Sequence, residues 1–191
     1  MVSVLTITLV LVSVLVLGYL LNTSIEHIIL TILKRSNISE PNQLYSQIVQ
    51  MHAHWGDAEG VGSEHTLDGK QYDAELHIVH YNTKYGNAGE AFDKEDGLAV
   101  LGMLLKVGKE NKELQKVLGR LKELEEVYDK VAIEESLIID NLLPADKSFF
   151  TYPGSLTTPP LYESVTWIVF NQPIEISQEQ VGFISYILSW H

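Results

Sequence analysis

The first hydrophobic pattern along the chain is an unbroken one. Residues 2–21 are uncharged and almost wholly apolar, and a helix of that length would be about 30 Å long, enough to cross a hydrocarbon core. No Lys or Arg precedes the run and no small-residue cleavage pattern follows it, which argues against a cleaved signal peptide. We therefore expect residues 1–35 to be an apolar helical segment that anchors the chain in a membrane through residues 2–21.

The charges after this run suggest an orientation. Lys34 and Arg35 are the next positive residues, and the positive-inside tendency then leaves the rest of the chain in the cytoplasm. The alternative is a soluble cytoplasmic protein whose apolar run comes from an alternative or misassigned first exon. Residues 36–46, which contain Pro41 and several polar side chains, are predicted to be a linker.

Beyond residue 46 the pattern becomes that of short strands. Residues 48–55 and 74–82 are strand-like, and residues 98–107 form an apolar run typical of a strand that is buried on both faces. Residues 165–170 return to the same strand-like composition. The sequence thus predicts a β-rich core.

Two segments break the strand pattern. Residues 109–130 carry an apolar stripe at helical spacing among Glu and Lys, which predicts one amphipathic helix on the sheet, with a coiled-coil helix as the alternative. Residues 151–160 contain three prolines and a glycine, so we expect no regular structure there.

Composition narrows the kinds of function. The 191 residues give room for one domain, and 46% hydrophobic with 20% charged residues is typical of a globular protein. A formal net charge of -12 provides no basic surface for nucleic acid and favours a small or neutral substrate. The absence of cysteine excludes disulfides and thiolate ligands. A transition-metal site would have to use nitrogen and oxygen.

The candidate chemistry lies in residues 50–80, which hold five of the seven histidines. Because a strand sends residues i and i+2 to one face, His52 and His54 can point at the same cation. A third imidazole is available at His77 if the two strands pair antiparallel. Three imidazoles would leave a tetrahedral zinc one open position. The alternative is that these are ordinary hydrogen-bonded histidines.

Imidazole ligands need partners that fix their tautomer. Gln50 and Glu75 each lie two residues before a candidate ligand, on the same face of the same strand, and are the predicted partners. The alternative is that both are merely polar surface residues.

Four motifs carry a resemblance to a known family: QMHAHWG, GSEHTLDGKQYDAELHIVHYNTKYG, DGLAVLGMLLKVG and YPGSLTTPPLYESVTWIVF. Over residues 47–180 the chain resembles the α-class carbonic anhydrases. The resemblance implies a mixed α/β, predominantly β fold, with a central, mostly antiparallel twisted sheet and a few peripheral helices. We expect a partial domain at residues 47–180, truncated at both ends relative to the family, and a divergent tail at residues 181–191.

The resemblance also implies a reaction, the reversible hydration of carbon dioxide to bicarbonate and a proton by zinc-bound hydroxide, with sensitivity to sulfonamide-type inhibitors. His52, His54 and His77 would be the zinc ligands. Thr157 would accept a hydrogen bond from the hydroxide and donate its own to Glu64.

The resemblance assigns the remaining candidates as well. His65 and His80 look like structural histidines, and no residue can be assigned as the proton shuttle. An apolar substrate pocket, with Thr158 beside it, would be lined by Val79, Val100, Leu156, Val165 and Trp167. The alternative function is a catalytically impaired carbonic-anhydrase-related interaction module or a truncated product. The three intact histidines favour the enzyme.

Overall fold

A computed structural model describes residues 47–56, 58–121 and 137–187 of the chain. The predicted anchor at residues 1–35, the linker at 36–46 and the last four residues of the predicted tail lie outside this description. Among the described residues, no helix has the length and apolar character needed to cross a membrane.

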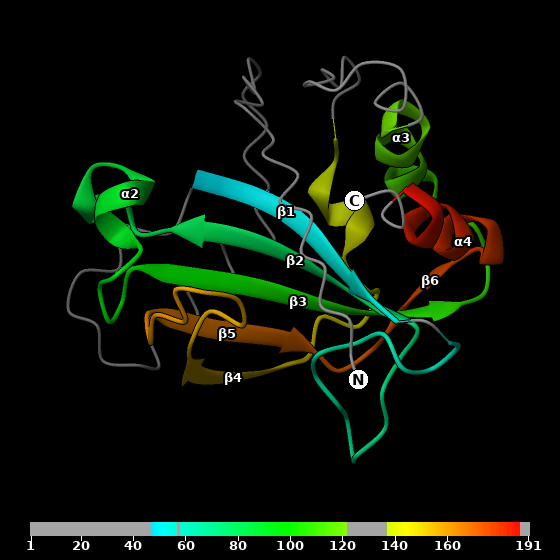
Figure 1. Ribbon diagram of the computed structural model, residues 1–191, viewed down its shortest axis with the longest axis horizontal. Helices are drawn as coiled ribbons and strands as arrows, with labels where there is room; N and C mark the ends of the chain where they lie inside the picture. Colours follow the sequence, from blue (N-terminus) through cyan, green and yellow to red (C-terminus); the bar gives the residue numbers. More distant parts are fainter. Residues whose placement is uncertain (1–46, 57, 122–136, 188–191) are drawn as a thin grey trace.

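The described chain is built around a six-stranded sheet with the order β1-β2-β3-β5-β4, and β6 pairs separately with β3 (Figure 1). The strands are β1 (Gln47–Trp55), β2 (Ala74–Tyr81), β3 (Leu98–Val107), β4 (Phe149–Gly154), β5 (Val165–Phe170) and β6 (Ile174–Ile176). The connection between β2 and β3 contains the short helices η1 (Thr83–Tyr85) and α2 (Ala88–Ala91).

The sheet is mixed. β2 pairs antiparallel with both β1 and β3, and β4 pairs antiparallel with β5, whereas β3 pairs parallel with β5 and with β6. The strand-dominated, mixed α/β class predicted from the sequence is confirmed, and so is the antiparallel pairing of the two histidine-bearing strands.

Helices cover one face of the sheet. In Figure 1, α3 (Lys112–Leu121), α4 (Gln178–Ile187) and η3 (Ile139–Leu142) lie together on the same side of the strands. Leu114, Val117 and Leu118 of α3 are buried against this face, as the amphipathic stripe predicted. α4 includes residues 181–187 of the predicted tail.

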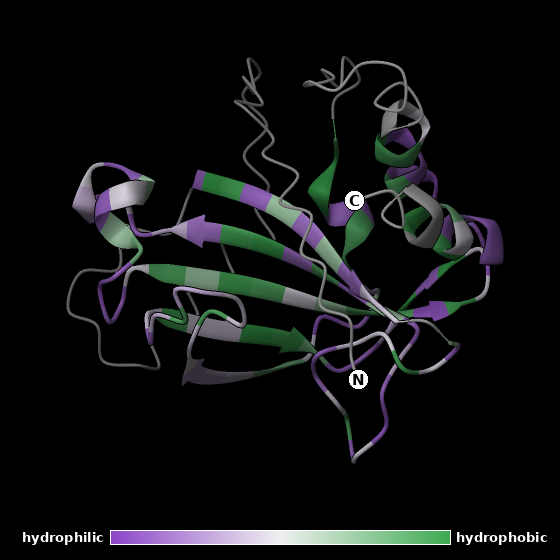
Figure 2. Ribbon diagram, in the orientation of Figure 1, coloured by the Kyte–Doolittle hydropathy of each residue, from purple (hydrophilic) through white to green (hydrophobic). Residues whose placement is uncertain are grey.

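Hydropathy follows burial along the strands. β3, whose first eight residues are all buried, is coloured as hydrophobic over most of its length in Figure 2, whereas β1 carries alternating polar and apolar bands. On β1, Met51, Ala53 and Trp55 pack into the helix-covered core. The alternate residues, including His52 and His54, therefore face the other side of the sheet.

One sequence-based expectation was wrong. Residues 151–154 are not irregular but form the second part of β4, with Pro153 opposite Thr166 of β5. β4 lies at the end of the strand order, and an edge strand tolerates proline because one side of it needs no hydrogen-bond donor. The regular structure ends at Gly154, before the remaining prolines.

Candidate metal centre

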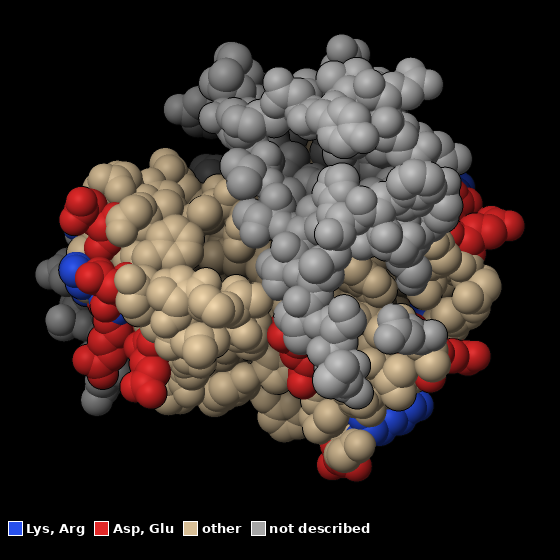
Figure 3. All heavy atoms as spheres, in the orientation of Figure 1, with Lys and Arg blue, Asp and Glu red and all other residues tan. Residues whose placement is uncertain are grey.

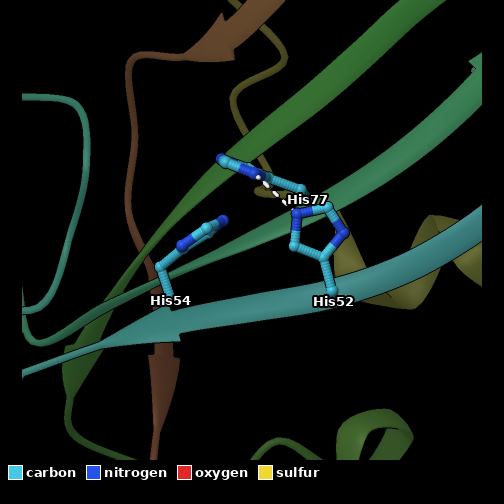
Figure 4. Close-up of side chains that lie close together, drawn as sticks. All are labelled: His52, His54 and His77. Atoms are coloured by element: carbon cyan, nitrogen blue, oxygen red, sulfur yellow. Dashed lines mark hydrogen bonds between the residues drawn. The ribbon is translucent and has the colours of Figure 1, made fainter. Parts of the chain in front are cut away.

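Two paired strands bring the three predicted ligands together. His52 and His54 come from β1, and His77, from β2, lies directly opposite His52 in the antiparallel register. Figure 4 shows the three rings close to one another, extending from these two strands. The i, i+2 spacing and the register were sufficient to produce this convergence.

The spacing of the nitrogens fits a metal ion. One ligand atom from each of the three histidines lies within 4.8 Å of the others, and the distance from His77 Nδ1 to His52 Nε2 is 3.3 Å. Two nitrogens bound to a tetrahedral zinc at about 2.0–2.1 Å would be roughly 3.3–3.4 Å apart. The donor set and its spacing therefore suit zinc.

Unpartnered buried atoms point to the same conclusion. His54 Nε2 and Glu64 Oε2 lie 3.3 Å apart, are both buried, and have no hydrogen-bond partner. Buried polar atoms seldom lack partners unless water or an ion completes the site. His54 Nε2 is thus free to act as a ligand.

The two β1 histidines are held in the neutral form that metal binding requires. Burial, together with the neighbouring His77 and His54, lowers the pKa of His52 to about 3. Burial likewise lowers the pKa of His54 to about 4, with His77 again contributing. At neutral pH both rings have a lone pair available without losing a proton first.

Of the two predicted tautomer-fixing partners, only Glu75 forms a hydrogen bond with its ligand. Glu75 Oε1 accepts a hydrogen bond from His77 Nε2 at 2.7 Å. Burial alone would raise the pKa of Glu75, but hydrogen bonds with His65 and His77 outweigh it, and the pKa lies well below its usual range. Gln50 lies two residues before His52, yet His52 Nδ1 is buried without a partner. The structure does not bring those two side chains into a hydrogen bond.

The predicted pair of Thr157 and Glu64 is brought together. Burial raises the pKa of Glu64, and a hydrogen bond with Thr157 opposes that effect. Glu64 Oε2 also lies 4.0 Å from His77 Nδ1. Because Thr157 contacts Glu64 and Glu64 lies beside His77, the loop that contains Thr157 lies next to the three histidines.

The residues predicted to line a substrate pocket lie in one apolar cluster on the histidine side of the sheet. Trp167 joins this cluster to the site, because its ring lies edge-on to the ring of His77 with centroids 4.8 Å apart. Thr158 is half-buried in the adjoining loop. The cluster includes Val79, Val100, Val165 and Trp167, with Leu156 packed against it.

Sequence reasoning missed Tyr152 and Gly102 at this site, and it took His65 for a structural histidine only. His65 and Tyr152 extend the hydrogen bonds of Glu75 toward the sheet edge. Gly102 lies opposite His77 on β3, where a Cβ atom would come within 3.1 Å of Glu75 Oε1. A glycine in the middle of a buried strand is a signal of such close approach.

Acidic side chains mark the outer surface. On the face shown in Figure 3 they gather at both ends of the molecule, including the end where α2 lies in Figure 1. Glu90, Asp93 and Glu95, in and just after α2, are exposed.

The fold and the site together describe a β-sheet protein with a cluster of three histidines that could hold a metal ion. The sequence profile of the eukaryotic-type carbonic anhydrases matches residues 18–191. The chain belongs to this family, whose members hydrate carbon dioxide and use zinc. The match extends at both ends beyond residues 47–180, the range that contains the motifs.

Proposed function

We propose that this chain catalyses the zinc-dependent, reversible hydration of carbon dioxide to bicarbonate and a proton. The observation that carries the proposal is the convergence of three imidazole nitrogens within 4.8 Å in a chain of the carbonic anhydrase family. The neutral state of His52 and His54 supports it, since both rings can bind a cation at neutral pH.

His52, His54 and His77 would hold the zinc. When bound, zinc lowers the pKa of the water it coordinates, as carbonic anhydrases themselves exemplify, and so supplies a nucleophile near neutral pH. Glu75 accepts a hydrogen bond from the N–H at Nε2 of His77. This leaves the lone pair of Nδ1 on the same ring to bind the metal.

Thr157 and Glu64 would orient the nucleophile. If the Thr157 hydroxyl donates its one proton to Glu64, its oxygen can only accept a hydrogen bond from the attacking group. That single acceptor restricts the direction of attack. The apolar side chains around Trp167 provide a dry surface for carbon dioxide, which has no charge and no strong hydrogen-bonding group.

The test is zinc content together with sulfonamide-sensitive carbon dioxide hydration by the full chain. We expect stoichiometric zinc and inhibitable turnover. Thr157→Val should reduce kcat/KM roughly a hundredfold with zinc content unchanged, because it removes only the orienting hydroxyl. The matched control is Thr151→Val, at another exposed threonine, on β4.

Metal-free protein with background hydration rates would overturn the proposal. The chain would then be better described as a carbonic-anhydrase-related interaction module.

The cellular location is proposed from the sequence alone. The chain would be anchored in a membrane through residues 2–21, with the zinc domain in the cytoplasm. If the N-terminal run is an artefact of exon assignment, the protein would be soluble in the cytoplasm. Sequencing the 5′ end of the transcript shows whether the N-terminal run belongs to the product. Fractionation of cells that express the full chain, with and without residues 1–35, shows whether the run anchors it.

A further inference from the structure

A line of hydrogen bonds runs from the metal centre to the edge of the sheet. Glu75 Oε1 contacts His77 Nε2 at 2.7 Å and His65 Nδ1 at 2.6 Å, while the backbone N–H of His65 donates to Glu75 Oε2 at 2.8 Å. The other ring nitrogen of His65, Nε2, lies 2.5 Å from the hydroxyl of Tyr152. Four side chains thus connect a candidate ligand to strand β4.

The chemistry of Glu75 fixes where each proton lies. An ionised carboxylate can only accept, so both His77 Nε2 and His65 Nδ1 must carry protons and donate them. A neutral imidazole has one N–H, so Nε2 of His65 is an acceptor and the hydroxyl of Tyr152 donates to it. By the same rule Nδ1 of His77, the nitrogen that faces His52, keeps its lone pair.

Packing holds the rings of this line in place. Trp167 lies edge-on to both His65 and His77, with ring centroids 4.8 Å apart in each case. Glu75 is fully buried and His65 is 17% exposed, so water is a poor substitute for either partner. Tyr152, at 41% exposure, is the point where the line reaches the surface.

We propose that Tyr152 and His65 are positioning residues for the metal centre, acting through Glu75 to hold His77 with its Nδ1 lone pair directed at the ion. Neither residue touches the metal or the substrate. The inference rests on the proposed zinc site and adds a role for Tyr152, which the sequence did not single out. It also gives His65 a task beyond that of a structural histidine.

Tyr152→Phe is the direct test, because it removes the hydroxyl and keeps the ring. A direct partner of a metal ligand is worth about 10–100-fold in metal affinity. Tyr152 lies two hydrogen bonds beyond Glu75, the direct partner, so its hydroxyl should contribute less, about 3–10-fold. We expect zinc to leave Tyr152→Phe about 3–10 times faster than wild type when a chelator is added. Tyr162→Phe, at a tyrosine that is 42% exposed, should release zinc at the wild-type rate.

Three measurements separate positioning from a merely structural role. The visible spectrum of the cobalt-substituted protein should change in Tyr152→Phe, while the Tm of the metal-free variant should stay near that of wild type. Long-range nitrogen NMR spectra of the metal-free wild type should show His77 protonated at Nε2 and His65 at Nδ1, with the population shifting in the variant.

Unchanged zinc release, cobalt spectrum and tautomers in Tyr152→Phe would overturn the inference and leave the zinc site standing. So would a lower Tm with unchanged metal release, since that result describes a structural tyrosine. If the wild-type chain binds no zinc, the proposed function and this inference both fail. A chain that binds zinc without hydrating carbon dioxide affects the proposed function alone, because none of these readouts measures turnover.

Discussion

The two faces of strand β2 are buried alike and carry opposite chemistry. Every residue from Ala74 to Tyr81 is buried. On the helix-covered face, Leu76 and Ile78 pack into an apolar core and gain stability from the surface they remove from water. On the other face, Glu75 and His77 pair in hydrogen bonds, because a buried polar group without a partner costs free energy. One strand thus separates the part of the protein that stabilises the sheet from the part that would do its chemistry.

His77→Ala should have the largest effect, and it acts on the polar face of β2. It removes one of the three convergent nitrogens, and we expect loss of stoichiometric zinc binding, measured by metal analysis and calorimetry. His80→Ala, at a buried histidine on the opposite face, should reduce stability but leave zinc stoichiometry intact. Zinc that remained stoichiometric in His77→Ala would show that the ligand assignment is wrong.

Ile78→Ala disrupts the packing of the other, helix-covered face of β2. The side chain is fully buried in the core, so its truncation leaves a cavity and should lower the free energy of unfolding by about 2–5 kcal/mol. Urea unfolding of the metal-free protein measures the loss. Zinc stoichiometry should not change. A destabilisation below about 1 kcal/mol would mean that this face is loosely packed.

His80 makes the apolar face sensitive to pH. Burial lowers its pKa to about 4, although hydrogen bonds with the backbone of Ile78 and Ala99 oppose the shift. In the unfolded chain the ring takes up a proton near pH 6.5, so between about pH 6.5 and 4 the unfolded state binds more protons. Stability should therefore fall as pH falls through that window.

The measurement is the free energy of unfolding of metal-free protein from pH 7 to pH 4. Since His52 and His54 also have lowered pKa values, the contribution of His80 is the difference from His80→Gln. That variant should show a shallower slope, and an identical slope would contradict the assignment.

Gly102→Ala is the smallest expected change. The added methyl would meet Glu75 Oε1 at 3.1 Å and Val169 Cγ2 at 3.4 Å, so the carboxylate must shift by a few tenths of an ångström. We expect zinc affinity to fall several-fold, less than the roughly 10–100-fold expected for loss of a direct partner of a ligand. Gly119→Ala, where the new atom meets nothing within 4 Å, is the control. Equal zinc affinity in both variants would show that Glu75 has room to move.

The parts of the structure that follow from local periodicity could be predicted from the sequence. Alternation on β1 and the apolar run of β3 were enough to place the strands, and the i, i+2 spacing of His52 and His54 located the site. The line through His65 and Tyr152 could not be predicted in this way. It depends on β4 pairing with β5 and on a loop that brings His65 back to Glu75, and no local pattern encodes either approach.

The failures have similar causes. Pro153 suggested irregular structure because proline is a poor strand residue, and only the position of β4 at the edge makes it acceptable. Gln50 shares the strand face of His52, but His52 Nδ1 has no hydrogen-bond partner. Spacing alone gives the face of a side chain and not the partner it reaches.

The connectivity of the sheet has a consequence for the order of folding. β1, β2 and β3 follow one another and pair in sequence, whereas β3 meets β5 and β6 across a long intervening chain. Contacts between distant segments require closure of a larger loop and form more slowly. We expect the three histidines to assemble before Thr157 and Trp167 arrive, so that metal could be captured by a half-formed sheet. Pulse-labelled hydrogen exchange during refolding with zinc should then protect β1 and β2 before β4 and β5.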